Sequence, residues 1–538
     1  MNADFSGIIH AYANQYEFDG TNKGRMKDFS AESHDAVRRL KRKLARAPGD
    51  ASAWFDLGTA YAATKDHRQA AESFGEAVSL QPRLWEAWAA KGREHHLLRD
   101  YPQAFDCYVK ALQLNNASPS IRNNLASLLK VLGELRLAEQ CLLEAIEIKP
   151  DYREAMNNLG NVYREMRRYR EAETSLKKSL SLGNDCADVW NNMGLVYKDQ
   201  MRLDEALTCY ERALAFPDYD PSLPFNYAIA LLQAGRMQEG WRWYEERWLL
   251  EPLRMRRAPY DQQYPEWGGE PLSGKRLVVW SEQGLGDLIQ MVRYLPLLKE
   301  RWPDAEVILR AEDVFQRLFR NLSGMDAFSA KSAGLPAADF HLPAMSFPAR
   351  FNTMVDTIPN VVPYLRPDPE LIAVWRRRLG ERSGKWRVGI IWESGAVGVG
   401  QTDFDRASRS LSGAELQHLF EGTPFEYVRL QLGGSLDPED LGITCIDPTP
   451  EITDFADTSA IMMNIDCVVS VDTAGAHLAA ALGLPTWTLM RFSGGNLFPG
   501  TGEEMPWYPN MRLVRQHAPG DWTSAIARLR EELLEFAR

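Results

Sequence analysis

Residues 468–485 read VVSVDTAGAHLAAALGLP. The β-branched run at the start is typical of a buried strand. Asp472 and Thr473 follow it, at the place where a helix N-cap is preferred. The alanine- and leucine-rich segment then predicts a helix that ends at the Gly-Leu-Pro signal. We therefore expect a strand, a tight turn and a helix whose first N–H groups favour a phosphate or diphosphate, with Gly475 keeping side-chain bulk away from it.

An ordinary strand–helix unit with a polar cap and a surface His477 would have the same local pattern. The segment also resembles the diphosphate-binding signature of the heptosyltransferase-like glycosyltransferases, which have the GT-B fold. The residues that carry the resemblance are Asp472, Thr473, Gly475, His477, Leu478, Gly483 and Pro485. The resemblance implies that Asp472, Thr473, Gly475 and His477 bind the donor.

Composition limits the classes of protein to which this chain can belong. With 538 residues, two to four domains are expected, and 45% hydrophobic with 25% charged residues is typical of a globular protein. A net charge of −11 argues against nucleic acid as the main partner. The start of the chain lacks a signal-peptide pattern and no apolar run is long enough to span a bilayer, so we expect a cytoplasmic protein.

A 34-residue period governs the N-terminal half from Ser33 onward. Small residues recur at this spacing in two columns, where two helices of a hairpin would cross closely: Gly58, Gly92, Ala126, Gly160, Gly194 and Ala228, and Ala70, Ala104, Ala138, Ala172, Ala206 and Gly240. Cys107, Cys141 and Cys209 share one slot of the same grid. We expect these cysteines to be small buried side chains, and the metal and disulfide interpretations are weak because no CxxC occurs.

The residues Trp54, Leu57, Gly58, Tyr61, Ala70, Phe74, Ala77 and Pro82 resemble the tetratricopeptide-repeat pattern. We expect a flexible arm over 1–32 and a helical superhelix over 33–248. The superhelix would contain a half-repeat cap at 33–50, five repeats over about 51–220 and a degenerate sixth at 221–248. The proline- and glycine-containing stretch 249–272 is expected to be a linker.

One column of the repeat is polar: Asn124, Asn158, Asn192 and Asn226. The first helix of each repeat lines the concave face of such a solenoid, where carboxamides can donate to and accept from the backbone of an extended acceptor peptide. Asparagine can equally be common at this slot without a binding role. The arrangement resembles the nucleocytoplasmic O-GlcNAc transferases, which join an asparagine ladder to a GT-B catalytic half.

The C-terminal half predicts two Rossmann-like lobes, 273–370 and 371–538. In the first lobe a strand over 276–280 leads to Gly284, Gly286 and Asp287, and a helix follows. Later strands are expected at 305–310 and near 339–342, and the alternation with helices implies a parallel sheet. The helix carries Leu-Pro-Leu-Leu at 295–298, as in the heptosyltransferase-like family. The resemblance implies that Gly284 and Gly286 serve the donor side and that Asp287 is the general base, with a helix N-cap as the alternative.

In the second lobe a strand near 387–391 runs into Trp392 and Gly395, at an edge where open α/β sheets bind ligands. The Arg409-Ser410 pair matches the family pattern, and Arg409 suits a donor phosphate because its guanidinium can bind two oxygens. A solvated loop arginine is the alternative. Gln431 follows the strand at 425–430.

Three further expectations concern this lobe. Asp403 and Asp405 could suggest a metal pair, but GT-B enzymes usually need none, so we expect no metal and no cofactor beyond the nucleotide-sugar co-substrate. The loop 491–496 lacks the family's Trp-Arg-Trp, which leaves the donor open. The helix over 522–538 is expected to cross back to the first lobe.

Taken together, the resemblance implies a cytoplasmic O-glycosyltransferase that modifies Ser or Thr of a protein held by the repeats. Because a pairing of this kind is similar to bacterial flagellin glycosyltransferases, flagellin modified by a nonulosonic acid such as pseudaminic acid is the leading specific expectation. A non-catalytic repeat scaffold with a degenerate transferase lobe, and an enzyme acting on lipopolysaccharide sugars, are the alternatives.

Overall fold

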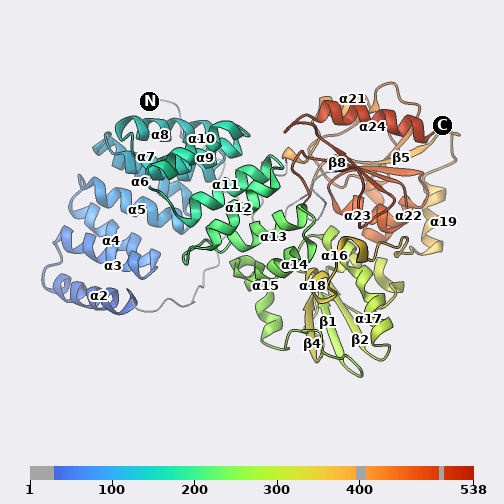
Figure 1. Cartoon of the computed structure of the whole chain (residues 1–538), viewed down its shortest axis with the longest axis horizontal. Helices are drawn as coiled ribbons and strands as arrows, with labels where there is room; N and C mark the ends of the chain where they lie inside the picture. Colours follow the sequence, from blue (N-terminus) through green and yellow to red (C-terminus); the bar gives the residue numbers. More distant parts are fainter. Residues whose placement is uncertain (1–28, 396–406, 496–501) are drawn as a thin grey trace. The chain divides into compact units, whose positions relative to one another are not determined.

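The computed structural model describes residues 29–395, 407–495 and 502–538 (Figure 1). The chain divides into two compact units, Met1–Asp185 and Cys186–Arg538. The first consists of helices, and the second adds two parallel sheets to further helices. The chain is thus an N-terminal α-solenoid followed by an α/β region, as the sequence predicts.

Helices of the first unit form antiparallel pairs along the chain, preceded by one capping helix. The described helices are α2 (Phe29–Arg46), α3 (Ala51–Ala63), α4 (His67–Leu80), α5 (Trp85–Leu97), α6 (Tyr101–Leu114), α7 (Pro119–Val131), α8 (Leu135–Ile148), α9 (Arg153–Glu165) and α10 (Tyr169–Ser181). Helix α2 lies where the half-repeat cap is expected, and the following helices pack in consecutive pairs. The predicted arm falls almost entirely outside the described residues.

The periodic small residues lie where the two helices of a pair meet. A Cβ added at Gly58 would lie 2.7 Å from the Phe74 ring, and one added at Gly160 would lie 2.6 Å from Leu176. Both distances are too short for a real carbon, so glycine is required by the crossing. Cys107 and Cys141 are buried in these pairs, as their shared slot predicts.

The second unit begins with more helices of the same kind. They are α11 (Ala187–Asp199), α12 (Leu203–Leu214), α13 (Leu223–Gln233), α14 (Met237–Tyr244), the 3₁₀ helix η1 (Glu245–Leu249) and α15 (Glu251–Asp261). The pair α13–α14 corresponds to the predicted degenerate repeat. Helix α15 lies in the stretch expected to be a linker. A helix can form there because Pro252 occupies its first turn, where the missing N–H breaks no helical hydrogen bond.

Buried side chains attach this helical stretch to the first sheet. Arg247 of η1 is fully buried and its Nη2 donates to Glu282 Oε1 at 2.9 Å and to Ser346 Oγ at 2.8 Å. Tyr260 of α15 stacks on Trp280 with ring centroids 4.0 Å apart. Because a buried charge is stable only when paired, the Arg247–Glu282 pair fixes the position of η1.

The first sheet is parallel, with strand order β3-β2-β1-β4. Its strands are β1 (Arg276–Trp280), β2 (Glu306–Ala311), β3 (Ala327–Ala330) and β4 (Phe340–Pro343). β3 was not predicted, because four half-buried residues without β-branched side chains give little signal. The elements after β1 are α16 (Leu285–Met291), η2 (Val292–Tyr294) and α17 (Leu295–Arg301); later elements are η3 (Asp313–Phe315), η4 (Leu318–Asn321), η5 (Ala344–Ser346), α18 (Phe347–Arg350) and η6 (Val355–Thr357).

The second sheet is also parallel, with order β6-β5-β7-β8-β9. Its strands are β5 (Arg387–Ile391), β6 (Glu426–Arg429), β7 (Cys467–Val471), β8 (Thr486–Met490) and β9 (Met511–Arg515). The described helices are α19 (Pro369–Arg378), α21 (Gly413–Phe420), η7 (Glu439–Leu441), η8 (Thr449–Glu451), α22 (Phe455–Met462), α23 (Ala474–Ala481) and α24 (Trp522–Phe536). The predicted strand, Thr473 cap and helix at 468–485 are confirmed.

Helix α24 corrects one expectation, since it stays on the second sheet and does not cross to the first. The Trp487 Nε1 of β8 donates to Glu532 Oε2 at 2.9 Å, and Arg530 Nη1 donates to His418 O of α21 at 2.7 Å. Trp522, Ile526 and Leu529 lie in the same core as β5 and β7. The apolar stripe of α24 is therefore covered by the sheet that it follows in sequence.

The close crossing of α3 and α4 yields a stability prediction. Gly58→Ala should destabilise this helix pair by about 1–3 kcal/mol, because the buried Phe74 ring must move. Gly75→Ala on α4 is the matched control: its added Cβ would be no nearer than 3.7 Å to Lys91 Nζ, so it should stabilise by roughly 0.5–1 kcal/mol. Native-state hydrogen exchange of α3–α4 amides measures both, and equal effects would contradict the account.

Candidate functional site

The two turns that the sequence singled out, one in each sheet, lie against each other. Helices α16 and α23 pack together. A Cβ added at Gly286 would lie 2.7 Å from His477 Cδ2 and 3.2 Å from Ala474 Cα. Each helix starts near the carboxyl end of its strand, β1 or β7. The structure therefore brings the predicted acceptor-side and donor-side motifs together at one place, where parallel sheets bind ligands.

Asp287 occupies the first turn of α16 and is half-buried. Its Oδ2 accepts a hydrogen bond from Gly284 N at 2.9 Å. Burial raises the pKa of its carboxyl group to about 6 and the negative charge of Asp472 adds to this, whereas the Gly284 N–H and Arg409 act in the opposite direction. The cap and base interpretations are thus compatible. Gly284 N holds the Oδ2 atom of Asp287, and the raised pKa brings the carboxyl group closer to the pH at which a general base works.

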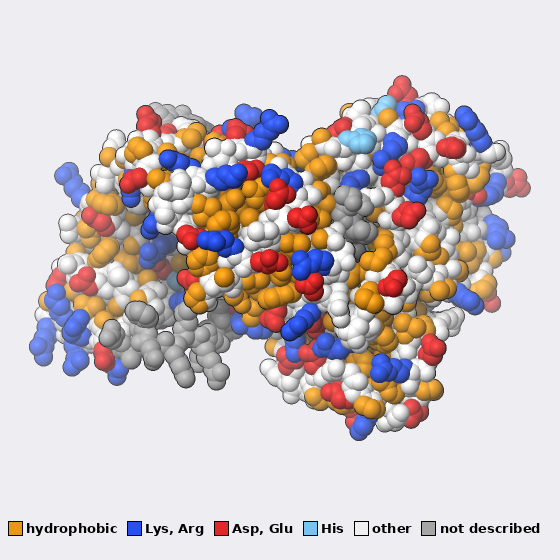
Figure 2. Space-filling model, in the orientation of Figure 1, with side chains coloured by type: hydrophobic (Ala, Val, Ile, Leu, Met, Phe, Trp, Pro, Cys, Tyr) orange, Lys and Arg blue, Asp and Glu red, His pale blue; other side chains and the backbone are white. Residues whose placement is uncertain are grey.

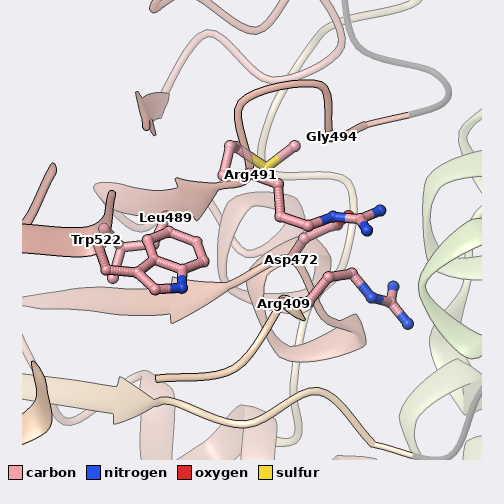
Figure 3. A pocket seen from close by; sticks show the side chains of 7 residues that line it. Arg409, Asp472, Leu489, Arg491, Gly494 and Trp522 are labelled. Atoms are coloured by element: carbon pink, nitrogen blue, oxygen red, sulfur yellow. The ribbon is translucent and has the colours of Figure 1, made fainter. Parts of the chain in front are cut away.

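Beside this contact lies a pocket with about 170 Å³ of atom-free space. Its lining comes from Arg409, Asp472, Leu489, Met490, Arg491, Gly494 and Trp522. Figure 3 shows Arg409 and Arg491 extending past Asp472 with their guanidinium groups pointing the same way. Two guanidinium groups in one pocket suit a phosphate.

Arg491 is a site residue that sequence reasoning missed. It lies just after β8, in the loop that departs from the family pattern. Its Nη1 donates to Ser408 Oγ at 3.0 Å, and its carbonyl oxygen accepts from Arg515 Nη1 at 3.3 Å. Its position in the sequence could have identified it, because Arg491 directly follows β8, the strand that pairs with β7. Residues at the carboxyl ends of neighbouring parallel strands lie at the same sheet edge, and Asp472 follows β7.

His477 is buried on the first turns of α23. Its Nδ1 lies 3.2 Å from Tyr508 Oη, and burial lowers its pKa to about 4 despite the opposing effect of Asp472. The imidazole is therefore neutral at physiological pH. It can orient a ligand through hydrogen bonds, but it does not supply positive charge to a phosphate.

Other predicted donor residues form the framework of the second sheet's edge. Gln431 Oε1 accepts from Glu393 N at 2.9 Å, and Ser410 Oγ accepts from Ser394 N at 3.0 Å. Gly395 is exposed, with open space around it. These contacts join the loops after β5 and β6 to the segment that carries Arg409.

Two predicted donor residues have packing roles in the structure. The Trp392 side chain is fully buried in the core of the second sheet and does not line the pocket. A Cβ added at Gly475 would lie 2.2 Å from Ile391 Cδ1, so glycine here serves the contact of α23 with β5. Thr473 caps α23 through its backbone geometry, and its Oγ1 lies 2.9 Å from Ser470 Oγ.

The asparagine column is linked to a second one, a residue earlier in each repeat. Asn158 Nδ2 donates to Asn123 Oδ1 at 2.8 Å, and Asn226 Nδ2 donates to Asn191 Oδ1 at 3.2 Å. Asn124 and Asn158 are half-buried, and Asn192 is 9% exposed. A carboxamide has two donors and two acceptor positions, so one such bond leaves capacity for a peptide.

Three expectations concern the Asp403–Asp405 pair, a metal site and a membrane-spanning helix. Asp403 and Asp405 lie outside the described residues. Within the described part of the chain, no cluster of three His, Cys, Asp or Glu side chains could hold a metal, and none of its helices combines the length and apolarity needed to cross a membrane. On the face in Figure 2, basic and acidic side chains are interspersed.

Comparison with known proteins identifies the repeats. Residues 30–82, 118–184 and 187–216 match tetratricopeptide-repeat models. Protein FlbA of Caulobacter vibrioides is 28% identical over 340 residues, which cover 59% of this chain and 55% of FlbA. The match thus spans about half of that relative's length.

Two similar solved structures are a hetero-tetramer and a TPR protein. The APC/C hetero-tetramer Cut9–Hcn1 is 19% identical with a TM-score of 0.38, covering 41% of this chain and 44% of that chain. YrrB, described as a TPR protein with an unusual peptide-binding site, is 19% identical with a TM-score of 0.28, covering 33% of this chain and 92% of that chain.

The charges around Asp287 predict how its pKa differs between the wild-type protein and two variants, Asp472→Asn and Arg409→Gln. In Asp472→Asn the repulsion is removed and the pKa should fall below about 6, whereas in Arg409→Gln an attraction is removed and it should rise. NMR of ¹³C-carboxyl-labelled aspartate, assigned with Asp287→Asn, measures all three values. An unchanged pKa in both variants would show that the three side chains do not meet.

Proposed function

We propose that the protein is a glycosyltransferase that moves a sugar from a nucleotide-sugar to Ser or Thr of an acceptor protein held by its repeats. The observation that carries the proposal is the meeting of the Asp287 turn with the diphosphate-signature turn, next to Arg409 and Arg491. A base and an anion site on opposite sides of one contact are what a displacement at a sugar carbon requires.

Each step follows from a group in the site. The acceptor hydroxyl gives its proton to Asp287 as its oxygen forms a bond to the anomeric carbon. The bond from that carbon to the phosphate oxygen breaks, and the electron pair leaves with the nucleotide. Arg409, Arg491 and the N-terminus of α23 stabilise the charge of the leaving phosphate. A single displacement of this kind inverts the anomeric centre, and no step uses a metal.

The acceptor is assigned to the solenoid. Tetratricopeptide repeats make up the N-terminal region, and YrrB, a repeat protein, is described as having a peptide-binding site. The half-buried carboxamides of Asn124, Asn158 and Asn226 suit an extended polypeptide of any sequence, whereas Asn192 is buried. The specific form of the proposal is a cytoplasmic enzyme acting on flagellin with a nonulosonic acid such as pseudaminic acid.

One observation favours a second candidate, a repeat scaffold whose transferase region no longer acts. The loop 491–496, which includes Arg491, lacks the Trp-Arg-Trp of the heptosyltransferase-like family. A scaffold would bind neither inorganic pyrophosphate nor nucleoside diphosphates in the arginine pocket. Binding of these ligands by the wild-type protein, abolished in Arg409→Gln, would therefore separate the two candidates.

The first prediction of this proposal concerns Asp287. Asp287→Asn should lower transfer by about 10²–10⁴-fold, because the amide cannot accept the hydroxyl proton, while pyrophosphate affinity stays within about two-fold. Asp313→Asn is the control, since Asp313 lies on the surface of the same lobe and its carboxylate accepts from Ser332 N and Ser332 Oγ. Incorporation of labelled sugar from a nucleotide-sugar panel is the measurement, and undiminished transfer would eliminate the base assignment.

The second prediction separates binding from repeat packing in the asparagine column. Asn158→Ala and Asn123→Ala both remove the bond between the two carboxamides, but only the first removes a side chain of the predicted peptide-binding column. Asn158→Ala should weaken acceptor binding by about three- to ten-fold, as expected for one or two hydrogen bonds, and Asn123→Ala should change it less. Equal losses measured by calorimetry would assign the column to packing alone.

A further inference from the structure

The last helix pair of the solenoid, α13–α14, is built into the α/β region. Ala228, Leu232 and Trp241 belong to one hydrophobic core with residues of both sheets. The Trp241 ring meets Trp507 edge-on, with centroids 6.3 Å apart and planes at 88°. This pair therefore shares its hydrophobic core with the α/β region.

One residue of α13 reaches the loop that carries Arg491. Gln233 is 3% exposed, and its Nε2 donates to Gly495 O at 3.2 Å. Among the described residues its Oε1 has no hydrogen-bond partner, so this single bond orients the carboxamide. Burying a carboxamide with one of its polar atoms unpaired lowers the stability of the fold. Holding the loop at Gly495 is a role that would explain why this cost is tolerated.

The second sheet holds the same loop from its other side. Arg515 Nη1 donates to Gly494 O at 2.8 Å, and Gln516 Oε1 accepts from Phe492 N at 3.2 Å. These anchors come from the end of β9, whereas Gln233 comes from a helix of the repeat array. The loop that lines the arginine pocket is thus fixed between the sheet and the last repeat.

One residue of α14 reaches the other loop of the site. Tyr244 is buried, and its Oη accepts from Gln283 Nε2 at 2.6 Å. Gln283 directly precedes Gly284, whose N–H holds Asp287. Burial raises the pKa of Tyr244 far above its usual value, and the charge of Asp287 contributes, so this hydroxyl stays neutral next to the candidate base.

We propose that α13–α14 is the positioning element of the site: Gln233 places the loop carrying Arg491, and Tyr244 places the turn carrying Asp287. The inference rests on the proposed function for its chemical meaning, since the two loops would serve donor and acceptor. Neither side chain is a catalytic residue, because each acts through a loop. The last pair of repeat helices and the two loops of the site then belong to the same compact unit.

The test uses full-length Gln233→Leu, which keeps the volume and removes the donor. Gln200→Leu is the matched control, because Gln200 ends the first helix of the preceding repeat and its Nε2 donates to Val196 O of its own helix. The first readout is hydrogen exchange of the Phe492 and Gly494 amides, which are bonded to Gln516 and Arg491 and need no ligand. The second is the affinity for inorganic pyrophosphate.

Gln233→Leu should speed exchange of both amides and weaken pyrophosphate binding, each by about five-fold, the effect of one lost hydrogen bond, with kcat nearly unchanged. Gln200→Leu should leave both as in the wild type. Unchanged exchange in Gln233→Leu would overturn the role of Gln233. If the wild type binds no pyrophosphate, the donor site and the proposed function fall, while the exchange result still decides whether the helix pair holds the loop.

Tyr244→Phe tests the other arm and keeps the ring in the core. It should speed exchange of the Gly284 amide by a similar factor and shift the acid limb of the pH–rate profile, without changing pyrophosphate affinity. A variant with normal Gly284 exchange and an unaltered profile would remove Tyr244 from the positioning element.

Discussion

The close approach of α16 to α23 is the constraint on which the rest of the structure depends. Gly286 meets His477 and Ala474 at distances that exclude any side chain. Only this approach lets an aspartate of one sheet influence the charges of the other, because electrostatic effects between partly buried groups fall off within several ångströms. The Gly-Leu-Gly-Asp turn and the Asp-Thr-Ala-Gly turn are therefore two halves of one contact.

A chain of buried polar groups fixes that contact from behind. Arg293 follows α16 in η2, and its Nη2 donates to Tyr364 Oη at 3.1 Å. Tyr364 Oη lies 3.1 Å from Tyr508 Oη, which lies 3.2 Å from His477 Nδ1. Since each of these groups would be costly to bury alone, sliding one sheet past the other would break several bonds together. The cluster explains why His477 is neutral and buried although its turn faces the site.

How far the sequence predicts this arrangement depends on the range of the interactions. Strong local patterns sufficed for the repeats, for β1 and β5, and for the strand, Thr473 cap and helix at 468–485. Short-range patterns could not reveal β3, whose residues are half-buried, or the surface that α24 covers, since an amphipathic helix shows which of its faces is apolar but not its partner. The prolines of the stretch 249–272 predict a linker because proline is a loop signal, but Pro252 occupies the first turn of α15, where proline is tolerated.

For the site, too, the sequence predicts single residues but not the tertiary contacts between them. Asp287, Arg409 and Asp472 are found from local motifs and family resemblance, yet their mutual influence requires the tertiary contact. Gly475 shows the converse error: the residue type was right, but the atom that excludes a side chain is Ile391 Cδ1 of β5. Arg491 had no motif to mark it, and only sheet order places it beside Asp472. Burial raises the pKa of the Asp287 carboxyl group to about 6, and Asp472 and Arg409, far away in sequence, act on it in opposite directions, so local motifs can mark these residues but not their electrostatic coupling.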